Sequence, residues 1–120
     1  MPSLELKTNV KLDDPKPFLQ EFSKYAAETL GKPEKYICVT YLHNENMAWH
    51  GTFDPAMLLT IISLDNLNPE ANIEYSKKFS DFFEKKLGVP GDRGYISFTD
   101  TGRDYLGYTG TTFGPIFGGK

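Results

Sequence analysis

The first two residues, Met1 and Pro2, carry the most reactive group that the sequence suggests. A small second residue usually permits removal of the initiator methionine, which would leave Pro2 with a terminal secondary amine. A terminal amine has a reference pKa of about 7.7–8.0, so it titrates close to neutrality. Burial or a neighbouring cation would lower that pKa and leave a neutral base at physiological pH. The dipeptide alone strongly favours an ordinary second residue with no role, so the rest of the chain must decide.

Other reactive side chains give weaker signals. Cys38 is the only cysteine and stands in an apolar run, which excludes an intrachain disulfide and predicts a buried, inert thiol. The two histidines, His43 and His50, lack a partner at metal-ligand spacing. The chain has neither a phosphate-binding glycine loop nor a nucleophile elbow. We therefore expect no metal and no cofactor.

The length and the net charge limit the classes to which the protein can belong. The 120 residues are enough for one domain with a core, and the formal net charge is −3. The basic residues are scattered, so we expect binding neither to nucleic acid nor to anionic membranes. No apolar stretch is long enough to span a bilayer, and the N-terminus lacks the features of a signal peptide. We expect a cytoplasmic protein, with export by a route without a signal peptide as an open alternative.

Hydrophobic periodicity places these residues on strands and helices. Alternation in residues 3–9 predicts a half-buried strand, with Leu4 and Leu6 on one face. Acids and prolines at residues 13–17 begin a helix that ends near Gly31. Further elements are expected as follows: strands at residues 35–43, 57–64 and 94–99, short strands at 47–49 and 105–108, and a helix from 69 to 87 with a buried stripe of Ile73, Phe79, Phe82, Phe83 and Leu87.

The order strand–helix–strand occurs twice, which indicates a duplicated β-α-β unit. Leu-Gly-Lys-Pro at residues 30–33 is echoed by Leu-Gly-Val-Pro at residues 87–90, and each precedes Tyr-Ile. Right-handed crossovers place both helices on one face of a shared four-stranded sheet. The other face is then bare, although residues 57–64 are apolar on both sides. We therefore predict an α+β fold whose bare face packs against copies of the same chain in a closed oligomer.

Several short matches, in order along the chain, point to a known family. They are Met1-Pro2, Thr8-Asn9-Val10, Gly31-Lys32-Pro33 with Tyr36-Ile37, Asp54-Pro55-Ala56, Asp92-Arg93 with Tyr95-Ile96, and Thr112-Phe113. With the two β-α-β units, the chain resembles the macrophage migration inhibitory factor family of the tautomerase superfamily. The resemblance covers residues 1–113, which we interpret as one tautomerase-like domain. Residues 114–120 would then form a glycine-rich, mobile tail.

The resemblance implies a homotrimer with active sites between subunits and no cofactor. The family's terminal proline, here Pro2, acts as a general base on a keto acid. Lys32 matches a lysine that holds the substrate carboxylate or enolate oxygen, although lysine is also common at helix ends as a solvated charge. Leu64 matches a residue whose backbone N–H binds substrate. Tyr95 matches a tyrosine from the adjacent subunit, with simple packing in the sheet as the rival interpretation.

Two further sets of residues affect which substrate the chain is expected to bind: the aromatic residues that match the walls of the family's pocket, and the residues that differ from the family pattern. Tyr36 and Phe113 match pocket aromatics that stack on an aryl substrate, and for both structural packing alone is equally plausible. Ser97 stands where the best-known members have asparagine, and Tyr108 where they have tryptophan; both remain expected substrate contacts. Residues 56–59 lack the cysteines of a thiol-redox motif, so no thiol oxidoreductase activity is expected.

Three functional hypotheses follow. The first is a keto–enol tautomerase acting on aryl pyruvates such as phenylpyruvate, with dopachrome-type compounds as further candidates. The second is a cytokine-like interaction protein that acts by binding a receptor or client, with weak or vestigial catalysis. The third is an α+β trimer with another role. A Pro2 variant separates the first from the second, because only the first needs the amine.

Overall fold

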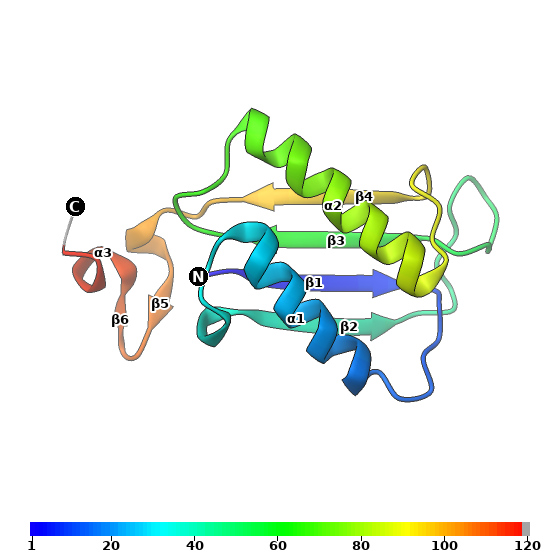
Figure 1. Cartoon of the computed structure of the whole chain (residues 1–120), viewed down its shortest axis with the longest axis horizontal. Helices are drawn as coiled ribbons and strands as arrows, with labels where there is room; N and C mark the ends of the chain where they lie inside the picture. Colours follow the sequence, from blue (N-terminus) through cyan, green and yellow to red (C-terminus); the bar gives the residue numbers. More distant parts are fainter. Residues whose placement is uncertain (119–120) are drawn as a thin grey trace.

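A four-stranded mixed sheet forms the centre of the protein. The computed structural model describes residues 1–118. The sheet comprises β1 (Ser3–Thr8), β2 (Cys38–His43), β3 (Met57–Ile62) and β4 (Gly94–Thr99), in the spatial order β2-β1-β3-β4 (Figure 1). β1 pairs with β2 and β3 with β4 in parallel, whereas the central β1–β3 pair is antiparallel. The predicted α+β fold with two β-α-β units is confirmed.

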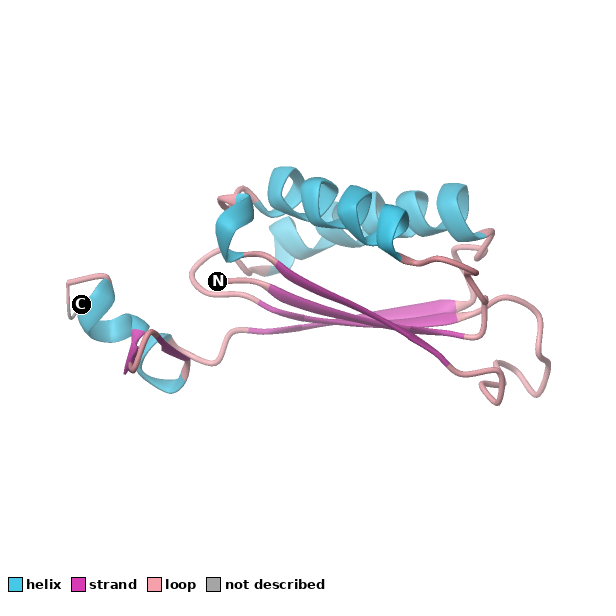
Figure 2. Ribbon diagram, turned by 90° about the horizontal axis from the view of Figure 1, so that it is seen from below, coloured by secondary structure: helices cyan, strands magenta, loops and turns pink. Residues whose placement is uncertain are grey.

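Two long helices cover one face of this sheet (Figure 2). α1 (Lys16–Leu30) begins with proline in its first turn and ends at Gly31, whose φ of 68° lies in the left-handed region that favours glycine. α2 (Pro69–Leu87) begins at Asn68, whose side chain accepts a hydrogen bond from the Ala71 N–H, and ends at Gly88. No helix within residues 1–118 has the length and apolar character needed to cross a membrane.

The core lies between the helices and the sheet. Leu4 and Leu6 of β1 and Leu59 and Ile61 of β3 point toward the helices and are almost fully buried. The helices contribute phenylalanines whose rings contact one another, among them Phe18, Phe22, Phe79, Phe82 and Phe83. Burying an aromatic side chain of this size stabilises a fold by about 1.5–3 kcal/mol. This cluster therefore holds β1 rigidly below the helices, with Pro2 at its start.

None of the residues 1–118 covers the opposite face of the sheet. The register brings Lys7, Leu58 and Tyr95 side by side across three strands, and Leu58 is 38% exposed. The sequence predicted residues 57–64 to be covered on both faces, and one chain covers only one of them. A second layer from copies of this chain remains our explanation for the apolar residues on the bare face.

The strand expected at residues 35–43 is shorter, and Cys38 is not buried. A single 3-10 turn, Glu34–Tyr36, precedes β2, which begins at Cys38. Cys38 pairs with Ser3, and since β1 exposes Ser3 on the bare face, the thiol is exposed there too. The prediction of a buried thiol was wrong, because apolar neighbours in sequence do not determine which face of a strand a residue occupies.

The predicted apolar stripe of α2 was wrong at Ile73, which is 69% exposed. An α-helix turns by about 100° per residue, so the six residues from Ile73 to Phe79 leave the two side chains about 120° apart. The other members of the stripe are buried. Ile73 therefore belongs to the solvent face of the helix.

The remaining chain forms small elements at the two ends of the sheet. The expected strand at 47–49 is reduced to one bridge between Trp49 and Thr52. At the other end, a 3-10 turn (Arg103–Tyr105) leads into the hairpin β5 (Gly107–Tyr108) and β6 (Thr111–Thr112). A helical turn, α3 (Phe113–Ile116), follows where the sequence predicted a mobile tail, and it projects beyond the sheet (Figure 1). Residues 119–120 of that tail lie outside the described residues.

Candidate active site

Pro2 lies at the head of the central strand and its side chain is fully buried. Its carbonyl accepts a hydrogen bond from the Cys38 N–H at 3.1 Å, which ties it to the first residue of β2. The structure retains Met1, so the Pro2 nitrogen is here part of an amide. The position of that nitrogen is set by the central pair of strands and therefore by the core, not by a free terminus.

A pocket of about 310 Å³ opens at this end of the sheet. Its lining includes Pro2 together with three of the predicted aromatic residues, Tyr36, Tyr108 and Phe113. The Tyr108 and Phe113 rings stack with centroids 5.4 Å apart and planes at 9°, and Tyr36 meets Tyr108 edge-on at 5.8 Å. Offset and edge-to-face pairs of this kind are the favoured aromatic geometries. The structure thus brings these four residues together from three separate segments.

Lys32 and Leu64 are joined directly. Lys32 follows the left-handed Gly31 at the end of α1, and its Nζ donates a hydrogen bond to the Leu64 carbonyl at 2.9 Å. Leu64 follows β3 and has no exposed surface. The bond holds the ammonium group at the same end of the sheet as Pro2. The sequence predicted a role for the Leu64 N–H, and the contact with its carbonyl is an addition from the structure.

The electrostatic environment of the N-terminus favours a neutral amine. Burial lowers the pKa of the Met1 amine, and the positive charge of Lys32 lowers it further. The carboxylates of Asp65 and Asp100 act in the opposite direction, but the pKa remains below its ordinary value of 8.0. Met1 also lines the pocket, directly before Pro2. An amine at this position is therefore a base that is available closer to neutral pH.

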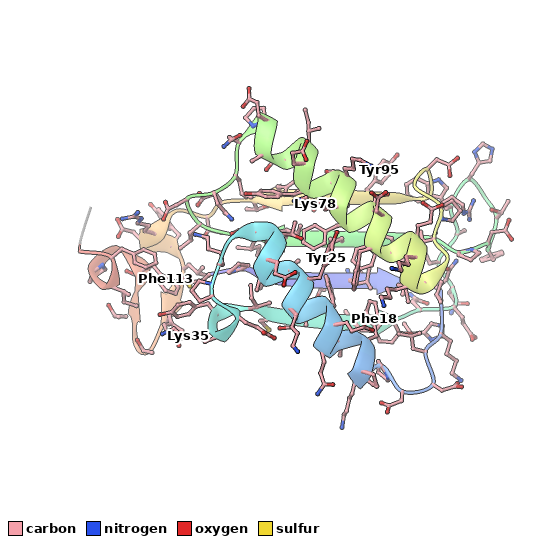
Figure 3. All side chains as sticks on the ribbon, in the orientation of Figure 1. Phe18, Tyr25, Lys35, Lys78, Tyr95 and Phe113 are labelled. Carbon is pink, nitrogen blue, oxygen red and sulfur yellow. The ribbon has the colours of Figure 1, made fainter. Side chains whose placement is uncertain are left out.

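Tyr95 and Ser97 lie away from this pocket within one chain. Tyr95 aligns with Leu58, which aligns with Lys7, five residues beyond Pro2 along β1. At about 3.3 Å per residue that separation is about 17 Å along the strand. Tyr95 is 69% exposed and its ring lies against Trp49 at 4.5 Å, while Figure 3 shows it far from Lys35 and Phe113.

Ser97 lies on the bare face, beside Thr60 in the register. Sequence reasoning did not predict the other residues that line the pocket, which are Met1, Ser3, Lys35, Ile37, Cys38, Leu106 and Gly107. Lys35 Nζ lies 5.0 Å from the centre of the Tyr36 ring, which adds a second cation near the pocket. Cys38 could have been found from the strand register once the strand was known to begin there. For Lys35 and Leu106 the sequence carries no comparable signal.

The fold and the pocket together define a class: a duplicated β-α-β protein with a buried proline at position 2 that lines a pocket walled by aromatic rings. The family model for Macrophage migration inhibitory factor (MIF) matches residues 1–114. The chain belongs to the macrophage migration inhibitory factor family, as the resemblance had indicated.

Individual relatives agree with this assignment. A macrophage migration inhibitory factor homolog from Trichinella spiralis is 36% identical over 94% of this chain and 100% of its own. Macrophage migration inhibitory factor from Xenopus tropicalis is 31% identical over 94% and 99% of the two chains. The solved structure of the homologue from Prochlorococcus marinus superimposes with a TM-score of 0.86 at 33% identity, covering 93% of this chain and 99% of that one.

Proposed function

We propose that this protein is a cofactor-independent keto–enol tautomerase of aryl pyruvates, with the Pro2 amine as general base. Membership of a family in the tautomerase superfamily supports an isomerase of this general kind. The observation that carries the specific proposal is the pocket that gathers Pro2, Tyr36, Tyr108 and Phe113. Its size and aromatic walls suit a single ring bearing a short acid chain.

The proposed step needs one mobile proton. After removal of Met1, the neutral Pro2 amine takes a proton from C3 of the keto acid, the carbon next to the ketone. The protonated Pro2 then returns this proton to the oxygen of the enolate, which gives the enol and restores the neutral amine. The reverse reaction uses the same groups. Lys32 and the Leu64 N–H hold the carboxylate or enolate oxygen, where a positive charge stabilises the developing negative charge. The aromatic walls hold the ring.

Completion of the site requires other copies of the chain. The separation of about 17 Å along the strand leaves Tyr95 of the same chain too far from Pro2 for contact. The exposed Tyr95 and Ser97, and the uncovered sheet face on which both lie, support a homotrimer in which a neighbour supplies them. Ser97 is shorter than asparagine and reaches less far toward a substrate, so we place phenylpyruvate before dopachrome-type compounds.

The decisive experiment compares two N-termini. Intact-mass measurement first establishes whether Met1 is removed, and the processed protein is then assayed for phenylpyruvate enolisation. An extension that keeps Pro2 in a peptide bond should lower kcat by about 10²–10⁴-fold, the usual contribution of a positioned proton-transfer group. Pro2→Gly should also abolish turnover, whereas Lys11→Gly, at an exposed position beyond the far end of β1, serves as the matched control. Undiminished turnover by the extended form would refute the proposal.

A second function is favoured by the names of the relatives, which refer to inhibition of macrophage migration. In that case the protein acts as a cytokine-like factor by binding a receptor or client. A Pro2→Gly variant that retains full biological effect but no turnover would support this function over catalysis. Loss of both together would favour the enzyme.

A further inference from the structure

The chain continues beyond the segment that resembles its relatives. The family model ends at residue 114, and the whole length of the Trichinella spiralis homologue is matched by 94% of this chain. Within this added segment, Phe117 closes the helical turn, because its N–H donates to the Phe113 carbonyl at 3.0 Å. The extra residues are therefore folded back on a residue that lines the pocket.

Phe117 packs against the back of that pocket wall. Its ring lies 5.3 Å from the Phe113 ring with planes at 28°, while Tyr108 stacks on Phe113 at 5.4 Å. Two rings, Tyr108 and Phe117, therefore stack on the Phe113 ring. Phe113 is only 2% exposed. Phe117 itself lies outside the pocket lining. Its contact with the pocket is made through Phe113.

The stack is anchored at its other end to the loop after β3 that carries Leu64. The Arg103 guanidinium lies 5.0 Å from the centre of the Phe117 ring. Arg103 Nε also donates to the Asp65 carboxylate at 2.9 Å. Asp65 directly follows Leu64, whose carbonyl accepts the hydrogen bond from Lys32. One continuous set of contacts therefore links the added segment to the ring-binding wall and to the loop beside Lys32.

We infer that Phe117 is a positioning residue that holds Phe113 in place as the wall for the substrate ring. The inference rests on the proposed function, because it assigns the C-terminal segment a role in the affinity of that same pocket for aryl substrates. A ring fixed by stacking loses less freedom when a second ring binds against it. The segment should therefore act on the ring of the substrate and leave proton transfer at Pro2 unchanged.

The test compares Phe117→Ala with Phe117→Tyr, which keeps the ring, and with Ile116→Ala, a neighbour in the same turn. Phe117→Ala should raise the KM for phenylpyruvate by about 2- to 12-fold, the range expected for one aromatic pair, with kcat within about twofold of wild type. The tyrosine variant and the control should retain wild-type KM. The KM for 2-oxobutanoate, which has no ring, should not change. If the alanine variant does not fold, Phe117→Leu removes the ring while keeping most of the volume and should shift KM in the same direction.

Binding of 3-phenylpropanoate, which has the ring and carboxylate but no ketone, separates this inference from the proposed function. An inactive wild type whose affinity for this probe falls in Phe117→Ala would refute tautomerisation and support the role of Phe117. An active wild type with the same KM as Phe117→Ala would overturn the inference alone. Equal KM increases for both substrates, or a fall in kcat alone, would also overturn it. Absence of any binding and activity in wild type would overturn both.

Discussion

Replacement of Lys32 by alanine tests the two ends of the proposed mechanism at once. Lys32 is expected to hold the substrate carboxylate, and its charge is one of the causes that lower the pKa of the N-terminal amine. Its Nζ also donates a hydrogen bond, 2.9 Å long, to the carbonyl oxygen of the fully buried Leu64. Lys32→Ala should therefore change affinity, the pH dependence of turnover, and stability.

The magnitudes follow from these contacts. A hydrogen bond to a charged group contributes about 1.5–3 kcal/mol, which at about 1.36 kcal/mol per tenfold change corresponds to an increase in KM of about 10- to 150-fold. An unsatisfied carbonyl near Leu64 would cost about 1–3 kcal/mol of folding stability. That loss should appear as a lower midpoint of urea unfolding.

The sign of the pH effect is determined by the charge. The base is active when neutral, so kcat/KM rises with pH through the pKa of the amine. Lys32 lowers the pKa of the Met1 amine by disfavouring its cationic form. We expect the same charge to lower the pKa of a Pro2 amine one residue further along, so removal of Lys32 should raise that pKa. The rising limb of the profile should therefore move to higher pH, and activity near pH 6 should fall more than activity near pH 8.5.

The assay is a steady-state pH profile of phenylpyruvate enolisation. Lys11→Ala is the matched control, since it removes the same charge from an exposed position after the far end of β1. The control should leave the limb and KM unchanged. A limb that stays in place or moves to lower pH in Lys32→Ala would refute the electrostatic argument. An unchanged KM would refute the contact with the carboxylate.

Three further variants test the framework of the site. Phe22→Ala, at a fully buried position among four other rings, should lower the free energy of unfolding by about 3–5 kcal/mol in urea, whereas Ile73→Ala on the solvent face should change it by less than about 0.5 kcal/mol. Asn9→Ala removes side-chain hydrogen bonds to four backbone groups in the connection between β2 and β3, so limited proteolysis there should become faster with little change in the unfolding midpoint. Leu58→Arg on the bare face should convert a species of three times the 13.6 kDa chain mass to monomer by native mass spectrometry; a monomeric wild type would contradict the trimer.

Periodicity in the sequence was enough to predict the main elements of the fold. The alternation of Leu4 and Leu6 predicted β1, and glycine after the last helical turn marked the ends of both helices near Gly31 and Gly88. These signals are local: a strand repeats every two residues, a helix every 3.6, and a left-handed cap favours glycine. The doubled order of elements then restricted the sheet to a few topologies. Membership of the family followed from the same short matches.

Sequence signals did not determine whether each residue faces the core or the solvent. Cys38 stands among apolar residues yet faces outward, because the register with Ser3 places it on the uncovered side of the sheet. Ile73 is exposed because it lies about 120° around the helix from Phe79, outside the buried stripe. Local composition describes a side chain, whereas its exposure depends on what the rest of the chain lays against it.

The sequence alone therefore determined the family and the β-α-β order, and it suggested Pro2 as the base, which stays a prediction. Only the tertiary structure decided that Pro2 shares a pocket with Tyr36, Tyr108 and Phe113, and that Phe117 supports that pocket from behind. The pocket joins Pro2, Tyr36 and the 108–113 segment, which are far apart in the chain, and no local period encodes such contacts. They arise from the packing of the hairpin and the C-terminal turn against the end of the sheet.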